Sequence, residues 1–348
     1  MSAKRREPET ETARSGGARP VLWLAAGFAF LLVAAAGVVA GGYYWLEREF
    51  TEPGPAGPDE TVMIEPGSGL IRIANTLERE GLISDAFVFR AMVSLEGGEG
   101  DLRAGEYAIP EAASMETIYR ILLEGETIQY PVTAAEGLTS AMIVRLVEAH
   151  PMLTGETGPV PPEGSLLPET YMVPRGTPRR DVIERMAEAQ DRLLAELWPQ
   201  RDPDLPFDTV EEAIILASIV EKETGVAEER PLVASVFVNR MRRGMRLQSD
   251  PTIIYGLTQG EPLGRGIRRS ELESLAGGYN TYQIDGLPPT PIANPGEASI
   301  RAVLNPPESD YLYFVADGTG GHVFAETLAE HNRNVAAWRR IERQGGGR

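Results

Sequence analysis

The first strong pattern in the chain is a run of 26 uncharged residues from Val21 to Leu46. About 20 apolar residues in a helix cross the hydrocarbon core of a bilayer, so this run predicts one transmembrane helix at 20–46. Trp23 near one end and the aromatic residues at 43–45 near the other fit the two aromatic belts of a membrane-spanning helix.

The charges beside this run predict its orientation. Residues 1–19 carry five basic and three acidic side chains, so the positive-inside rule makes them a cytoplasmic tail and places the remainder outside the inner membrane. A cleaved signal peptide is the alternative, because small residues occur at 34–36 and 39–40. The apolar part of a signal peptide is shorter, however, at about 7–15 residues.

Short amphipathic segments follow. Residues 47–60 include a stretch rich in Pro and Gly and predict a semi-rigid linker. Residues 61–130 show three apolar patterns with helical spacing and a short strand at 106–109, which indicates a small α+β module. The expected N-caps of its helices are Ser68, Ser84 or Asp85, and Ser114, and the expected stops include Gly81 and Gly125.

A larger domain of mixed α/β type is expected over 131–343, with a disordered tail at 344–348. Residues 151–168 contain five prolines and three glycines and predict a spacer or a loop that lines a cleft. The fold class is therefore α+β, with one transmembrane helix, a small module and a larger domain.

The segment 208–225 is the most informative part of this domain. Thr209 and Glu212 fit a capping box, Gly225 is the expected C-terminal stop, and the residues between leave almost no polar face. A helix that is apolar all round is buried. Its last turn, residues 221–223, is therefore expected in or beside the core.

Two carboxylates lie in the last turn of this helix, where the negative end of the helix dipole repels their charge. Burial and the dipole both disfavour ionisation, which would raise a carboxyl pKa towards the range of a general acid. Glu223 continues the stripe of Leu216 and Val220, whereas Glu221 points elsewhere. An exposed, purely structural end of a core helix is the other interpretation, and spacing alone leaves both open.

Two polar clusters follow at 248–250 and 279–282, the second with two tyrosines and an asparagine. Such groups beside proline turns suit sugar recognition, although ordinary loop chemistry gives the same pattern. The net charge of −18 argues against nucleic acid as the main partner. The chain has no cysteine, which excludes thiolate zinc sites and Fe–S clusters, and its three scattered histidines do not predict a His-rich metal site.

Taken together, these segments resemble the endolytic murein transglycosylases of the MltG or YceG-like family. The resemblance rests on long motifs in a fixed order: EGSLLPETY (163–171), ASIVEKET (217–224), VASVFVNRMRRGMRLQSDPTIIYG (233–256), YNTY (279–282), GLPPTPIANPG (286–296) and YLYFVADGTGGHVF (311–324). It implies an inner-membrane protein with a LysM-like module at 61–130 and a catalytic domain at 131–343. That domain would cut peptidoglycan strands internally and release nascent strands beside the peptidoglycan synthases.

The resemblance also implies roles for individual residues. Glu223, the second Glu of the EKET motif, would be the catalytic acid that produces 1,6-anhydro-muramic ends without a metal or cofactor. The residues expected to bind substrate are Gln248, Ser249, Asp250, Tyr279, Asn280 and Tyr282. Glu221, Lys222 and Asn239 are expected to support them. Two alternatives are a muramidase with Asp250 or Glu221 as the second carboxylate, and a peptidoglycan-binding scaffold without activity.

Overall fold

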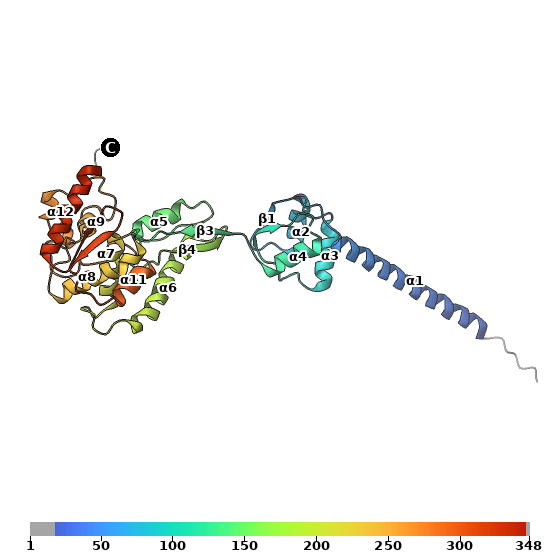
Figure 1. Ribbon diagram of the computed structural model, residues 1–348. Helices are drawn as coiled ribbons and strands as arrows, with labels where there is room; N and C mark the ends of the chain where they lie inside the picture. The colour runs from blue at the N-terminus through green and yellow to red at the C-terminus, as the bar shows by residue number, and fades with distance from the viewer. Residues whose placement is uncertain (1–17, 346–348) are drawn as a thin grey trace, which may run out of the picture. The chain divides into compact units, whose positions relative to one another are not determined.

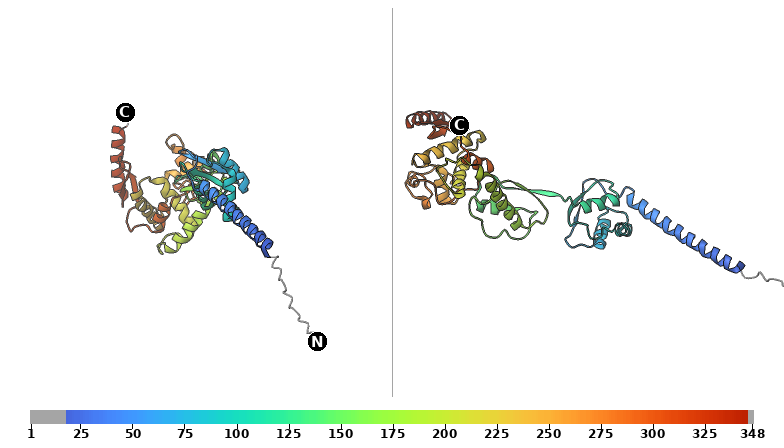
Figure 2. Two further views of the ribbon diagram at one scale, coloured as in Figure 1. Left: turned by 90° about the vertical axis from the view of Figure 1, so that its right-hand side faces the viewer. Right: turned by 90° about the horizontal axis from the view of Figure 1, so that it is seen from below.

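The computed structural model describes residues 18–345 of the chain. These residues form a mixed α/β structure in two units, divided between Ile128 and Gln129. Figures 1 and 2 show the elements of each unit. The expected cytoplasmic tail lies outside the described residues up to position 17.

The first unit begins with helix α1 (Ala18–Thr51). Its segment Trp23–Thr51 is long and apolar enough to cross a membrane by length and composition, a test that a signal sequence also passes. The remaining elements are β1 (Glu60–Ile64), α2 (Leu70–Arg79), α3 (Ala86–Glu96), β2 (Gly105–Ile109) and α4 (Met115–Glu124). β1 and β2 pair antiparallel, from Glu60 opposite Ile109 to Ile64 opposite Gly105.

Residues 47–60, where the sequence predicted a linker, are ordered parts of the first unit. α1 continues to Thr51, and both Phe50 and Ala56 are buried in the core. The backbone of Gly54 donates to Ala112, whose own N–H donates to Ala56. The Pro- and Gly-rich segment is thus held by packing and hydrogen bonds rather than extended between two parts.

Local capping follows the sequence in most places. Asp85 accepts from the N–H groups of Phe87 and Val88, and Ser114 accepts from Thr117. Gly81 and Gly125 take the positive φ expected at helix ends. The Ser68 prediction is wrong: Gly69 is the N-cap of α2, because Ser68 belongs to the preceding turn, where its N–H donates to Glu65.

The second unit is mainly helical. A two-stranded antiparallel sheet joins β3 (Gln129–Thr133) to β4 (Thr170–Pro174), and a second joins β5 (Tyr313–Ala316) to β6 (His322–Ala325). The α-helices are α5 (Ser140–Ala149), α6 (Arg179–Leu197), α7 (Val210–Glu223), α8 (Arg230–Arg242), α9 (Asp250–Thr258), α10 (Arg269–Leu272), α11 (Glu297–Leu304) and α12 (Leu328–Gly345). Short 3₁₀ turns occupy Trp198–Gln200, Ala227–Glu229 and Ala276–Gly278.

Helix α7 is the centre of the second unit. It packs against α8, α9 and α11, and every residue from Ala213 to Val220 is buried. The expected capping box is present, because Thr209 accepts from the N–H of Glu212 and the Glu212 carboxylate accepts from the N–H of Thr209. Because the helix is packed on all sides, the position of its last turn relative to the core is fixed.

The C-terminal end of the chain departs from the expected tail at 344–348. Gln344 and Gly345 belong to the last turn of α12, and positions 346–348 lie outside the described residues. The segment 151–168 ends in the core, where Leu166 and Leu167 are buried.

Candidate active site

Glu223 is the last residue of α7 and is partly buried. The helix ends here because Thr224 is extended and its hydroxyl accepts from the N–H of Val226. Gly225 is therefore not the stop that the sequence predicted. The ending at 223 leaves the Glu223 side chain at the edge of the core, facing the segment that begins α9.

Ser249, the N-cap residue of α9, holds the Glu223 carboxylate. Its hydroxyl donates to Oε1 of Glu223, and only 1% of Ser249 is exposed. The backbone N–H of Ser249 donates to the Thr281 hydroxyl at 2.9 Å, and Thr252 and Thr281 hydrogen-bond at 2.9 Å. Buried hydroxyl groups of two distant segments thus fix the donor that meets the carboxylate.

The pKa of Glu223 is raised from 4.5 to about 7. Desolvation by burial is the main cause, and the negative charge of Asp250 adds to it. The hydrogen bond from Ser249 lowers the pKa, as do the charges of His322 and Arg240, without reversing the shift. A carboxyl group with a pKa near 7 can give up and regain a proton at neutral pH, as a general acid and base must.

The Glu223 carboxylate opens into a cleft of about 430 Å³. Four residues that the sequence predicted as the acid or as substrate ligands line it: Glu223, Gln248, Asp250 and Tyr282. The Tyr282 hydroxyl donates to Oδ1 of Asp250 at 2.8 Å. Its pKa is raised by burial and by the Asp250 charge, so the phenol keeps its proton.

The other side chains that line the cleft include Arg240, Tyr313 and His331, which the sequence did not single out as site residues. Arg240 is 8% exposed, donates to the carbonyls of Leu312 and Leu247, and lies 5.2 Å from the centre of the Tyr313 ring. Arg240 lies in the motif at 233–256 and Tyr313 in the motif at 311–324, but neither motif indicated what these side chains would face.

His331 stacks on Tyr313 at 5.1 Å between ring centres. Its Nδ1 is buried and has no hydrogen-bond partner among the described residues. Burial, and then the charge of Arg240, lower the pKa of His331. The imidazole is therefore neutral at pH 7, and it lies in the lining of the cleft.

The other predicted residues lie outside the lining of this cleft. Asn280 is fully buried and its amide donates to backbone carbonyls, including that of Ser274 at 2.6 Å. Asn239 likewise donates to the carbonyl of Ser309 at 2.7 Å. The Tyr279 ring lies 5.0 Å from Tyr255 and its hydroxyl bonds to Thr290. These three side chains hold loops in place.

Glu221 and Lys222 face away from Glu223. The Glu221 carboxylate accepts from the N–H of Gly296 at 3.0 Å and the Ser299 hydroxyl at 2.7 Å, and it pairs with Arg230. Its side chain is 5% exposed. Lys222 donates to the carbonyl of Gly137 at 3.2 Å. Glu221 therefore ties the end of α7 to the start of α11.

The part of the chain that the structure describes contains no group of three His, Asp or Glu side chains arranged to hold a metal ion.

Comparison with known proteins was made on both sequence and structure. A sequence model of the YceG-like family matches residues 62–337. The endolytic murein transglycosylase of Streptococcus pneumoniae serotype 2 (strain D39) is 30% identical over 355 residues, an alignment covering 88% of this chain and 63% of that protein. The endolytic murein transglycosylase of Bacillus subtilis (strain 168) is 28% identical over 331 residues, with 85% and 90% covered.

This chain thus spans less than two thirds of the length of the pneumococcal relative. Among solved structures, a yceG-like protein from Listeria monocytogenes is 31% identical and superposes with a TM-score of 0.49, covering 79% of this chain and 98% of its own. Because the family model covers well over half of the residues, the chain belongs to the YceG-like family.

Proposed function

We propose that this chain is an endolytic lytic transglycosylase that cleaves peptidoglycan strands between N-acetylmuramic acid and N-acetylglucosamine. Family membership and the names of the relatives support the reaction class. The observation that carries the assignment to a residue is the Glu223 carboxyl, whose pKa is raised to about 7 at the wall of a polar cleft.

In the proposed reaction Glu223 acts first as acid and then as base. The protonated carboxyl gives its proton to the glycosidic oxygen as the bond to C1 of the muramic sugar breaks. The resulting carboxylate then takes the proton from the C6 hydroxyl of the same sugar, whose oxygen bonds to C1 and closes a 1,6-anhydro ring. Because the nucleophile belongs to the substrate, it is already positioned and no second carboxylate is required.

The cleft residues suit this sequence of steps. Ser249 donates to the carboxylate and stabilises it after the first proton transfer. Gln248, Asp250, Tyr282 and His331 present polar atoms that can bind sugar hydroxyls and N-acetyl groups. The predicted ligands Tyr279 and Asn280 and the predicted supporting residue Asn239 are assigned the role of holding the loops around the cleft.

A muramidase is the second candidate, because Asp250 lines the same cleft as Glu223 and could activate a water molecule. Glu221 is a poor candidate for that role, since its carboxylate is occupied by Arg230 and by the start of α11. In a muramidase Asp250→Asn abolishes cleavage, whereas in a lytic transglycosylase cleavage to anhydro ends continues.

We assign α1 as a single-pass inner-membrane anchor with the N-terminus in the cytoplasm and the acidic remainder outside. The length of the apolar segment and the basic residues before it support this topology. The module at 61–130 is assigned as LysM-like and the part at 131–343 as the catalytic domain. Peptidoglycan strands are the substrate, and release of nascent strands beside the synthases is the cellular role that follows.

The test is mass spectrometry of the products from purified peptidoglycan, with the full chain, Glu223→Gln and Asp250→Asn compared. Anhydro-muramic ends from the wild type and from Asp250→Asn, and none from Glu223→Gln, are the expected result. Hydrated reducing ends would assign a muramidase. Binding of peptidoglycan with no cleavage would indicate that the protein is a peptidoglycan-binding scaffold without activity.

A further inference from the structure

The apolar helix α1 ends inside the core of the first unit. Phe50 is 1% exposed, and its ring centre lies 6.3 Å from that of Phe89 and 6.2 Å from that of Tyr119. Leu46, the last residue of the uncharged run, precedes Phe50 by four residues, or about 6 Å along a helix axis. The headgroup region of a bilayer is about 5–7 Å deep on each side. A helix that crosses the membrane therefore brings the folded unit directly onto the headgroups.

Hydrogen bonds show which part of the unit lies beside the end of α1. The Ser84 hydroxyl, just before α3, donates to the Glu49 carboxylate of α1 at 3.1 Å. The N–H of Ala86 at the start of α3 donates to the Glu78 carboxylate near the end of α2 at 3.0 Å. The C-terminal end of α2 and the N-terminal end of α3 are thus both held at the α1 side.

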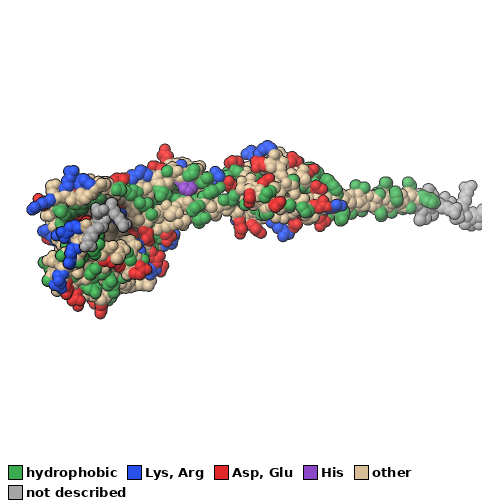
Figure 3. All heavy atoms as spheres, turned by 45° about the horizontal axis from the view of Figure 1, so that its top comes forward, with side chains coloured by type: hydrophobic (Ala, Val, Ile, Leu, Met, Phe, Trp, Pro, Cys, Tyr) green, Lys and Arg blue, Asp and Glu red, His purple; other side chains and the backbone are tan. Residues whose placement is uncertain are grey.

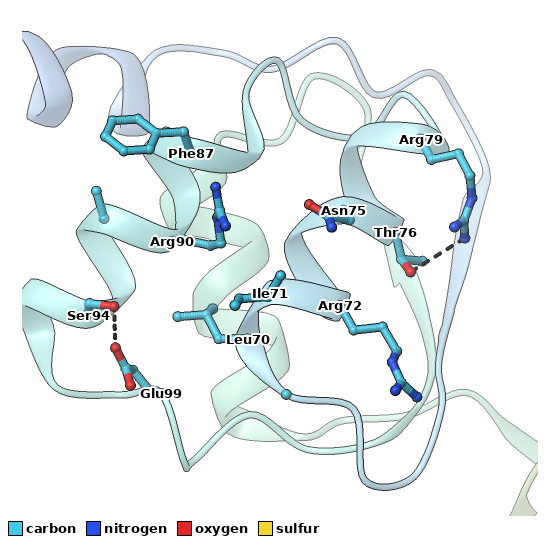
Figure 4. Close-up of a pocket in the computed structure, with 12 residues that line it drawn as sticks. Leu70, Ile71, Arg72, Asn75, Thr76, Arg79, Phe87, Arg90, Ser94 and Glu99 are labelled. Carbon is cyan, nitrogen blue, oxygen red and sulfur yellow. Dashed lines mark hydrogen bonds between the residues drawn. The ribbon is translucent and has the colours of Figure 1, made fainter.

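Helices α2 and α3 enclose a groove of about 1010 Å³ (Figure 4). Phe87, Arg90 and Arg79 line the end of the groove that lies at the α1 side. Ser94 and Glu99, which hydrogen-bond to each other, line the opposite end together with Arg72. The Phe87 ring is 59% exposed. It is a large apolar side chain that the other described residues of the first unit leave mostly exposed.

The groove is also a local concentration of positive charge. Residues 52–128 carry 15 acidic and five basic side chains, and three of those five, Arg72, Arg79 and Arg90, line this groove. Acidic side chains are spread over the face of the first unit in Figure 3, and basic ones lie in small groups at its edges. A group of arginines that faces phosphate groups gives an otherwise acidic body a favourable contact with them.

We propose that the α1-side end of this groove binds the phospholipid headgroup layer, with Phe87 inserted between headgroups and Arg79 and Arg90 on lipid phosphates. The proposal rests on the anchoring role assigned to α1. An aromatic ring is favoured at the membrane interface, and guanidinium groups bind phosphate with two parallel hydrogen bonds. Arg79 pairs with Glu80 at 3.4 Å on the surface, a weak contact that phosphate can replace.

This contact fixes the height and orientation of the first unit above the membrane. The buried Phe50 joins α1 to the unit, and the groove supplies a second point of attachment. Rotation of the unit about α1 would then be restricted even though only one helix crosses the bilayer.

Spin labels can measure the depth of each site in the full chain, reconstituted in vesicles of phosphatidylethanolamine and phosphatidylglycerol. The chain has no cysteine, so each introduced cysteine carries the only label. Phe87→Cys probes the α1-side end, and Ser94→Cys is the matched control, two turns later on α3 and at the other end of the groove. Val33→Cys, exposed in α1, reports whether the helix is in the bilayer.

The label at position 33 is expected to be accessible to oxygen and inaccessible to a water-soluble nickel chelate. The nickel accessibility of the label at 87 is expected to be several-fold lower than that of the label at 94. Equal nickel accessibility at 87 and 94, with 33 immersed, would overturn the proposal and leave the anchor intact. An aqueous label at 33 would overturn the anchor itself. Shielding of 87 only after peptidoglycan fragments are added would assign the groove to glycan instead of lipid.

Arginine variants test the electrostatic part. Arg79→Gln with Arg90→Gln in the Phe87→Cys background is expected to increase nickel accessibility at position 87. Arg72→Gln, at the far end of the same groove, is expected to leave it unchanged. An effect of Arg72→Gln about half that of the double variant, in proportion to the one charge removed instead of two, would show that only net charge matters and that the arginines at the α1 side have no specific contact.

Discussion

Replacing Glu223 by Gln is expected to stabilise the second unit at pH 8, although it removes the proposed acid. The pKa of this carboxyl is raised from 4.5 to about 7, chiefly by burial. The folded chain therefore holds the proton more tightly than the unfolded chain. The cost of ionising the folded carboxyl is absent below about pH 4.5, grows between pH 4.5 and 7, and is complete above pH 7, where it amounts to about 3 kcal/mol.

Glu221→Gln is the matched control, two residues earlier on the same helix. Its carboxylate accepts two hydrogen bonds from the start of α11 and pairs with Arg230, whose side chain is 11% exposed. Loss of that negative charge removes one of the two carboxylates beside the Arg230 guanidinium and leaves it paired with Glu136, at 3.1 Å. The expected effect is therefore of opposite sign, a destabilisation of about 1–3 kcal/mol at pH 8.

The assay is denaturant unfolding of the full chain in detergent at pH 4.5 and pH 8. The signal is the fluorescence of Trp198, which packs on the core of the second unit, with the other three tryptophans of the chain replaced by Phe. A Glu223→Gln variant no more stable than the wild type at pH 8 would refute the raised pKa. Equal stabilisation at both pH values would also refute it, because the gain would then come from packing and not from ionisation.

Three further changes test other parts of the structure. Ser249→Ala removes the hydroxyl that donates to the Glu223 carboxylate and should raise the pKa of Glu223, moving the alkaline limb of the kcat/KM profile up by about one to two pH units. Ser218→Ala, which changes a buried serine elsewhere on α7, should leave the alkaline limb in place. An unshifted limb in Ser249→Ala would contradict the assignment of Glu223 as the acid whose pKa Ser249 lowers. Asn294→Ala should lower the unfolding free energy of the second unit by about 2–4 kcal/mol, because its buried amide bonds to Leu166, Leu138 and Ser140; an unchanged denaturation midpoint would be the contrary result. Phe50→Ala should cost the first unit about 3–5 kcal/mol, measured by hydrogen exchange of α3 and α4, and unaltered exchange there would show that α1 is not part of that core.

The sequence was sufficient where structure depends on neighbouring residues. The caps at Asp85, Ser114 and Thr209 and the glycine ends at Gly81 and Gly125 were predictable, because a cap joins groups two to four residues apart. Full burial of α7 was predictable too, since its residues leave no polar face. The errors at Ser68 and Gly225 arose where a neighbouring turn offered the backbone a competing hydrogen bond.

The residues of the candidate site could be predicted only in part from the sequence. Its pattern drew attention to the last turn of the helix at 208–225, because a charged group at the end of a buried helix is unusual, and to the polar clusters at 248–250 and 279–282. The family resemblance then pointed to Glu223. The pattern gave no way to separate Asp250, which lines the cleft, from Asn280, which is buried under a loop. Polar side chains that bind a ligand and those that hold a loop have the same local pattern.

Tertiary structure alone decided what surrounds the Glu223 carboxyl. Ser249 meets it across 26 positions of the chain, and Arg240, Tyr313 and His331 join the same cleft from α8, β5 and α12. Tertiary packing also made Phe50 part of the first unit's core instead of a linker. Local hydrogen bonds and apolar periodicity determine individual helices, but burial and charge at a side chain are set by residues far away in sequence. The sequence therefore determined where the carboxyl lies on its helix, and the fold determined its pKa.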